Sequence, residues 1–177
     1  MNKKTRAYAN YSAKSLDQSL SCSTQSAASL AGLLKTPKDK IDQTLTHLHS
    51  VLDVPESQDG LIRLLHPSFR DFLLNEQRCL NPQFLIDEKQ AHHDLFNRSP
   101  RAMSNFLRRD ICDLRLPGAR AAGVNKSKVD KHIPLHVQYA CRYWVRHLQQ
   151  SNFNPYDYSN VQIFLQKHFL YGLRLLH

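Results

Sequence analysis

Ten histidines are the residues of this chain whose type and spacing first suggest chemistry. Two of them, His132 and His136, have the i,i+4 spacing that places two imidazoles on one helix face, as a metal site would need. Pro134 lies between them and disturbs such a helix, and no HExxH pattern surrounds them. The adjacent His92 and His93 point about a hundred degrees apart on a helix and do not easily share an ion. The sequence therefore predicts no metal site.

Motifs for nucleophilic catalysis and for phosphate transfer are absent from the sequence. It has no glycine-rich P-loop, no GxSxG elbow and no cysteine in a recognisable nucleophile context. We therefore assign no catalytic residue and do not expect the chain to be an enzyme. The cysteines are widely spaced without a CxxC pair, which favours reduced thiols in a cytoplasmic protein. They are Cys22, Cys79, Cys112 and Cys141.

His66 has the sharpest functional interpretation, because it lies between a short strand pattern and the start of a helix. It stands in the run LLHPSFRDFL, residues 64–73. A histidine at a helix start can donate a hydrogen bond to an anion, such as a nucleotide phosphate that a neighbouring domain supplies. The alternative is a junction histidine whose ring bonds a nearby carbonyl. The spacing alone leaves both interpretations open.

Two helices are predicted ahead of this strand pattern. After a polar tail over residues 1–18, small and apolar residues recur at helical spacing within 24–34. A second helix is predicted to begin with Thr36 as its capping residue and Pro37 in its first position. The side chains predicted to face inward along this second helix are Ile41, Leu45, Leu48 and Leu52.

After residue 50, the spacing of the apolar residues changes from that of a helix to that of short strands. Residues 51–54 and 61–65 are typical of two strands joined by a polar loop. A helix begins after His66, with Phe69, Phe72 and Leu73 predicted to face inward. Two helices followed by two strands and a connecting loop indicate a winged helix with a two-stranded wing, which we assign to residues 19–80.

Residues 81–177 predict a second, irregular helical domain, so the fold class is mainly α. The predicted helices cover about residues 88–109, 135–149 and 159–175. Pro100 lacks an amide hydrogen and clashes with the preceding turn, so we expect a kink or break near residues 97–99. The residues predicted to be buried are Ala91, Leu95, Ala102 or Met103, Phe106, Val137, Ala140, Cys141, Trp144, Leu148, Val161, Phe164, Leu165, Phe169 and Leu173. An irregular connection is expected over 112–134.

The formal charge of +9 makes nucleic acid, an acidic protein surface or anionic lipid conceivable partners. A winged helix can place its second helix in the major groove of DNA. That helix carries possible DNA contacts at Lys38, Lys40, Gln43 and Thr44. Aspartates 39 and 42 share its surface and repel phosphates, so nucleic acid is not the expected partner. A small winged-helix DNA-binding protein remains the alternative function.

No run approaches the roughly 18 apolar residues of a membrane span, and the basic start of the chain has no apolar stretch of the secretory kind. We therefore expect a cytoplasmic protein without a membrane-spanning segment.

Four runs resemble the segment that follows the nucleotide-binding core in fungal NACHT proteins. They are residues 48–55, 63–74, 137–148 and 164–171, and the resemblance covers about residues 20–172. NACHT proteins of this kind are STAND-class, NLR-like P-loop NTPases that include vegetative incompatibility proteins. The resemblance implies a winged helix followed by a helical domain. It also implies that His66 touches the phosphate of bound ADP and keeps the protein closed until ATP replaces ADP.

This chain departs from the family in ways that limit what the resemblance implies. It has no P-loop and no Mg-binding acidic motif, so ADP and ATP belong to the parent family and no cofactor is expected here. Pro100 interrupts a helix of the family, and the pattern drifts after Gly172, as in a truncated or divergent product. We therefore expect a non-catalytic regulatory fragment that acts through protein partners or a neighbouring NACHT domain.

Overall fold

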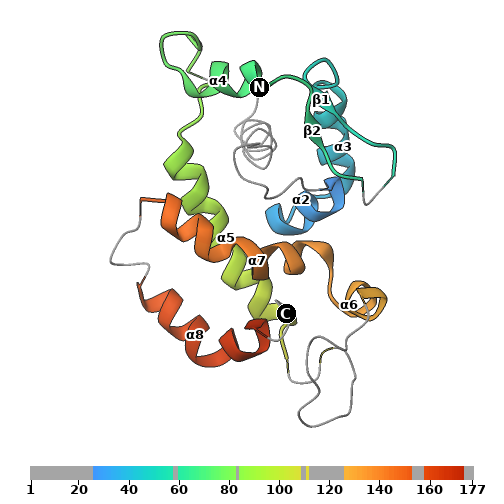
Figure 1. Cartoon of the computed structure of the whole chain (residues 1–177), viewed down its shortest axis with the longest axis vertical. Coiled ribbons are helices and arrows are strands. Elements are labelled where there is room, and N and C mark those ends of the chain that lie inside the picture. The colour runs from blue at the N-terminus through green and yellow to red at the C-terminus, as the bar shows by residue number, and fades with distance from the viewer. Residues whose placement is uncertain are drawn as a thin grey trace. The chain divides into compact units, whose positions relative to one another are not determined.

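The computed structural model describes residues 26–57, 60–82, 84–108, 111, 126–152 and 158–173 (Figure 1). The helices are α2 (Ala27–Leu34), α3 (Lys38–Thr46), α4 (Pro67–Leu74), α5 (Glu88–Phe106), α6 (Lys126–His132), α7 (Leu135–Gln150) and α8 (Tyr158–Leu173). The strands are β1 (Leu52–Asp53) and β2 (Arg63–Leu64). The prediction of a mainly α fold with a short two-stranded sheet is confirmed. The polar tail and residues 112–125 of the predicted irregular connection lie outside the described residues. The rest of that connection is not irregular as predicted, because α6 occupies Lys126–His132.

Helices α2 and α3 contact each other, and their junction is organised by caps. Ser26 caps α2 by accepting a hydrogen bond from the Ser29 amide at 3.2 Å, and Lys35 ends the helix in the left-handed region at φ 49°. Thr36 does not cap α3, which corrects the sequence prediction. Its hydroxyl donates to the carbonyl of Leu34 at 3.3 Å, and α3 begins after Pro37. The carbonyls at the end of α2 lack helical partners and recruit this hydroxyl.

The two strands form an antiparallel pair with Leu52 opposite Leu64 and Asp53 opposite Arg63. Both leucines are buried, whereas both charged residues face solvent, so one face of the pair covers the core. A further antiparallel bridge joins Ser26 to Leu61, just ahead of β2. The sequence placed Leu52 both at the end of the second helical pattern and in the first strand pattern, and the strand assignment is correct, because α3 ends at Thr46 and Leu52 belongs to β1.

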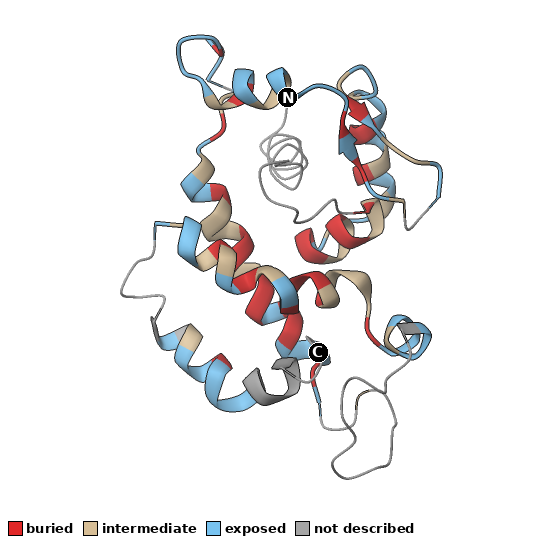
Figure 2. Cartoon of the chain, viewed as in Figure 1, coloured by how far each residue is buried: buried red, intermediate tan, exposed pale blue. Residues whose placement is uncertain are grey.

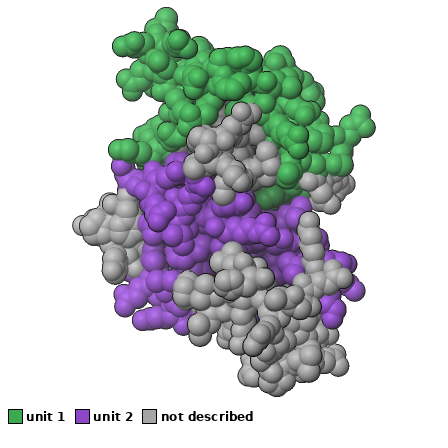
Figure 3. All heavy atoms as spheres, in the orientation of Figure 1, with its two compact units in different colours: residues 1–91 green, residues 92–177 purple. Residues whose placement is uncertain are grey.

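The chain divides into two compact units, residues 1–91 and 92–177, and the division falls within α5 (Figure 3). The buried apolar residues of α2, α3 and the strand region in the first unit are Leu30, Leu33, Leu34, Ile41, Leu45, Leu52, Ile62 and Leu64 (Figure 2). Farther along, Leu73 of α4 packs with Ile86, and the Ile86 amide donates to the Leu73 carbonyl at 2.9 Å. Of the three α4 residues predicted to face inward, Leu73 is buried, Phe69 is half-buried and Phe72 is 38% exposed.

The second unit has its own core, to which α5, α7 and α8 contribute (Figure 2). Its buried members are Phe96, Met103, Leu107, Ile133, Val137, Ala140, Cys141, Trp144 and Phe164. Most residues predicted to be buried here are buried, and Leu148 and Val161 are half-buried. Phe106 and Leu165 are exceptions at 38% and 39% exposure, because Leu107 and Phe164, each one position away, occupy the core instead. The side chains of Phe169 and Leu173 lie outside the described part.

The sequence predicts a kink or break near residues 97–99, and no break occurs there, because α5 runs without interruption from Glu88 to Phe106. A proline inside a helix costs about 3 kcal/mol or more. Phe96 and Met103, about one turn on either side of Pro100, are each 1% exposed in the core of the second unit. Burial of these two side chains is worth a comparable amount, so packing holds the helix through the proline.

Candidate functional site

His66 occupies the junction between β2 and α4, as the sequence predicted. Its backbone is extended, at φ −143° and ψ 131°, and it is the N-cap of α4. Pro67 follows in the first helical position, where the missing amide hydrogen costs nothing and the fixed φ suits the helix. The helix start therefore holds the His66 backbone in a defined direction.

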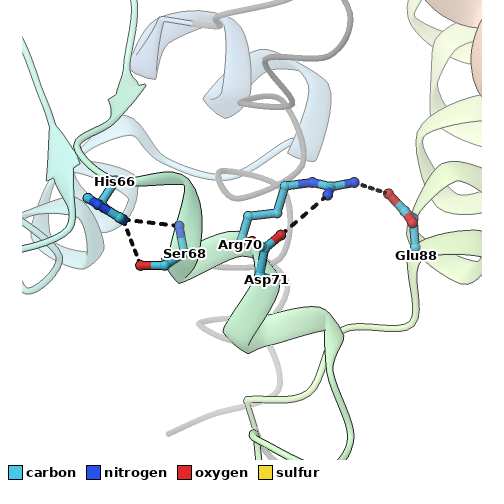
Figure 4. Close-up of polar contacts among 5 residues, drawn as sticks. All are labelled: His66, Ser68, Arg70, Asp71 and Glu88. Atoms are coloured by element: carbon cyan, nitrogen blue, oxygen red, sulfur yellow. Dashed lines mark hydrogen bonds and ion pairs between the residues drawn. The ribbon is translucent and has the colours of Figure 1, made fainter.

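The ring of His66 bonds the first turn of α4 (Figure 4). Its Nδ1 accepts from the amide of Ser68 at 3.2 Å and lies 2.7 Å from the hydroxyl oxygen of the same residue. A backbone amide can only donate, so Nδ1 must offer its lone pair. The proton of the neutral ring is then on Nε2. The partner of His66 is thus Ser68 and not a carbonyl, and the ring keeps a second nitrogen as a donor.

His66 and its neighbour Leu65 are exposed, with Leu65 at 57% of its possible surface. Among the residues that the structure describes, no hydrogen-bond or ion-pair partner is found for Nε2 of His66. A buried ring enclosed by aliphatic neighbours would have ruled out a contact with an external anion, and His66 is not of that kind.

Arg70 of α4 makes two charged contacts, one with Glu88 at the start of α5 and one with Asp71 of α4 itself (Figure 4). A guanidinium nitrogen of Arg70 donates to Glu88 Oε1 at 3.0 Å, and another lies 4.0 Å from Asp71 Oδ1. The Arg70 side chain is 27% exposed and that of Glu88 is 43% exposed, so water screens the pair and its stabilisation is at most about 1 kcal/mol. Arg70 is therefore engaged with carboxylates in this conformation.

The residues of the DNA-binding alternative lie on α3 and differ in their exposure. Lys40 and Gln43 are exposed. Lys38 forms an ion pair with Asp42 at 3.3 Å. Thr44 is buried at 9% exposure, and its hydroxyl donates to the carbonyl of Lys40 at 2.8 Å. In this conformation Thr44 has no free hydroxyl to offer a base edge, and Lys38 shares its charge with a carboxylate.

Three ring residues come together that the sequence analysis did not connect. His92 Nδ1 lies 2.9 Å from His147 Nδ1, and His147 Nε2 lies 2.7 Å from the hydroxyl of Tyr139. By contrast, His93 lies beside Asn97 on its own helix. His92 and His147 are 55 residues apart, so no local spacing could have paired them. Within the described ranges there is no group of three or more His, Cys, Asp or Glu residues that could hold a metal ion.

Burial perturbs two titratable groups of the second unit. It lowers the pKa of His136, whose ring packs edge-on against Phe106 with centroids 5.4 Å apart. It raises the pKa of the Cys141 thiol to about 12, and the nearby Arg142 only partly opposes this effect. A thiol with such a pKa is protonated at neutral pH, so Cys141 is not an activated nucleophile.

Comparison with known proteins gives one informative relative. The chain is 28% identical over 180 residues to the vegetative incompatibility protein HET-E-1 of Podospora anserina. The match covers 83% of this chain and 12% of that protein, so the chain corresponds to a small part of its relative. The similarity supports a NACHT-like relationship at the level of the family. No family model and no solved structure matches the chain. No helix in the described part is long and apolar enough to cross a membrane.

Proposed function

We propose that this chain is a non-catalytic regulatory region of a NACHT, NLR-like signalling NTPase of the STAND class. It acts in the cytoplasm by contacting a nucleotide-binding domain and other protein partners. The similarity to a vegetative incompatibility protein over 83% of the chain supports this proposal. The sequence has none of the motifs that bind and hydrolyse nucleotide, so ATP turnover belongs to another part of the parent protein.

The first unit is best interpreted as a winged helix. Two helices precede two antiparallel strands, and the loop between the strands would be the wing. An isolated antiparallel bridge also joins Ser26 to Leu61, so the residue before α2 pairs with the segment just ahead of β2. This order and pairing support the assignment more strongly than the helix count alone.

The main support for the proposed nucleotide contact is the way the two nitrogens of the His66 ring are used. Its Nδ1 is used to cap α4, and this leaves Nε2–H as an exposed donor beside a helix start. A charge-assisted hydrogen bond to phosphate is worth about 1.5–3 kcal/mol. That is roughly a 10- to 100-fold effect on ADP retention. Because binding costs several kcal/mol in lost freedom, His66 would hold ADP only together with a nucleotide-binding domain.

The test uses this chain together with the nucleotide-binding domain of its parent protein. His66→Asn keeps a side-chain oxygen that can cap α4 but removes the donor at Nε2. The expected result is ADP release about 10- to 100-fold faster than from the unmodified complex, with the helix content unchanged. Ser68→Ala is the matched control, because it alters the same turn without touching Nε2. Equal ADP release from the His66→Asn and unmodified complexes would refute the nucleotide contact.

A second, independent test asks where the nucleotide machinery is encoded. The proposal predicts a P-loop in the coding sequence immediately upstream of this chain. It also predicts that the chain alone shows no ATP turnover. Nucleotide hydrolysis that depends on this chain alone would contradict a purely regulatory role.

DNA binding is the second candidate function, and the exposed Lys40 and Gln43 on α3 are the observation in its favour. It predicts a duplex complex that weakens steeply with salt, because phosphate contacts release counterions. Replacing Lys38 and Lys40 with glutamine should then abolish an electrophoretic shift. Absence of any shift at moderate salt would remove this candidate.

A further inference from the structure

The contact between His92 of α5 and His147 of α7 has an uncommon geometry, because it joins two ring nitrogens of the same kind. The two Nδ1 atoms are 2.9 Å apart, and the rings are tilted by 35° with centroids at 5.1 Å. On the far side of His147, Nε2 lies 2.7 Å from the Tyr139 hydroxyl. All three residues belong to the second unit, and they lie outside the site around His66.

A hydrogen bond between two Nδ1 atoms requires one hydrogen between them. One ring donates Nδ1–H, and the other must keep its Nδ1 lone pair as the acceptor. A neutral pair satisfies this condition, and so does a pair that has gained one proton at an Nε2. A second added proton would charge both rings and place two N–H groups against each other at 2.9 Å. The contact therefore tolerates one charge and not two.

The burial of this contact makes a second positive charge on the two rings still less favourable. His147 is 5% exposed and Tyr139 is 7% exposed, whereas His92 is half-buried, so water screens two cationic rings only weakly where they meet. Tyr143 packs on Tyr139 with ring centroids 4.8 Å apart. The other titratable or charged groups within about one turn of the pair along the two helices are Glu88, Lys89, His93, Asp94, Tyr143 and Arg146. The Glu88 carboxylate is bonded to Arg70, which offsets its charge.

We propose that the His92–His147 pair is a pH-sensitive contact between α5 and α7, which is stable with at most one added proton and opens when the second proton binds. Acidification would then loosen the core of the second unit by separating these helices. The device is independent of the nucleotide contact proposed for His66, and it would give the region a response to cell acidification.

The expected effect of pH on stability follows from the number of protons that the pair binds in the folded and in the unfolded chain. Below the usual titration range of histidine, about pH 6.5, the unfolded chain carries two protons on this pair and the folded chain one. A difference of one proton changes the unfolding equilibrium constant by up to tenfold per pH unit. The second unit should therefore lose stability steeply between pH 6 and pH 5.

Trp144 is the sole tryptophan of the chain and lies 7% exposed in the core of the second unit, so its fluorescence reports unfolding of this unit. Urea unfolding is followed at several values between pH 7.5 and pH 5. In His147→Gln the contact contains one ionisable ring instead of two, so acidification no longer places two cationic rings against each other. The unfolding equilibrium constant of this variant should lose most of its tenfold change per pH unit. That of His93→Gln, which leaves the pair intact, should retain it. If His147→Gln folds and its unfolding equilibrium constant changes with pH as steeply as that of the unmodified chain, the proposal is overturned.

A measurement on the unmodified chain covers the case in which His147→Gln does not fold. Long-range proton–nitrogen spectra of the imidazoles should show the pair gaining a single proton on acidification. The native Trp144 emission should be lost when the pair gains its second proton. Uptake of both protons with that emission unchanged would overturn the proposal. A stoichiometric rise of the unfolding midpoint with Zn²⁺, accompanied by shifts of the Nδ1 signals of His92 and His147, would also overturn it, because it would make the two nitrogens metal ligands.

Discussion

Phe164 is expected to account for much of the attachment of α8 to the rest of the second unit. It is 3% exposed, and its ring packs edge-on against Trp144 with centroids 5.3 Å apart and planes at 71°. Ile163, its neighbour on the same helix, is 51% exposed. Replacing a buried phenylalanine with alanine costs about 3–5 kcal/mol. The edge-on aromatic pair contributes about 0.5–1.5 kcal/mol of that total. We therefore expect Phe164→Ala to lower the free energy of unfolding of the second unit by about 3–5 kcal/mol.

The assay is equilibrium unfolding in urea, followed by the fluorescence of Trp144. The emission of the folded Phe164→Ala protein should already shift to the red, because the variant exposes one edge of the indole. Ile163→Ala is the matched control, and it should change the free energy of unfolding by no more than about 0.5 kcal/mol. If the two variants unfold at the same urea concentration with the same Trp144 emission, α8 does not pack on α7 in the way described.

Three further predictions concern single groups. A Cβ on Gly60 would clash with the Pro55 side chain, so Gly60→Ala should destabilise the loop between β1 and β2 by about 1–3 kcal/mol, measured as faster amide exchange of the strand residues. Burial lowers the pKa of His136, so its contribution to stability is complete above pH 6.5 and is lost as the pH falls through the lower folded pKa. His136→Asn should therefore reduce the pH dependence of the melting temperature over this window, and the His92–His147 pair should account for the part that remains. The Cys141 thiol, with its pKa raised to about 12, should resist iodoacetamide at pH 7.4 and react only after addition of urea, as peptide mass spectrometry can measure.

The sequence could predict those parts of the fold in which one pattern is repeated over several turns. Val137, Ala140, Cys141 and Trp144 follow the helical period of α7, and all four are buried. Such a broad apolar stripe must face a core whatever its neighbours are, so its burial follows from the sequence. The two short strands were predictable for a related reason, because a cluster of turn residues separates two short strand-like runs.

Where the sequence prediction failed, the outcome depended on contacts between distant residues. Pro100 should break an isolated helix, but the buried Phe96 and Met103 hold α5 together. In α4, an eight-residue helix presents only a narrow face, so Leu73 is buried while Phe72 remains 38% exposed. Intrinsic preferences act over a few residues, and packing across the unit can outweigh them by several kcal/mol.

At the candidate site, the sequence predicted the position of His66 but not the state of its ring. That state arises because the Ser68 amide, one of the unpaired amides of the first turn of α4, bonds Nδ1. The bond has two consequences for the proposed phosphate contact. It fixes the hydrogen on Nε2, and it holds the side chain in one orientation, so a ligand need not supply the roughly 0.5–1.5 kcal/mol that ordering a side chain costs. Capping the helix and presenting a donor are therefore one arrangement, and a variant that loses the cap should also weaken the proposed contact even where a donor remains.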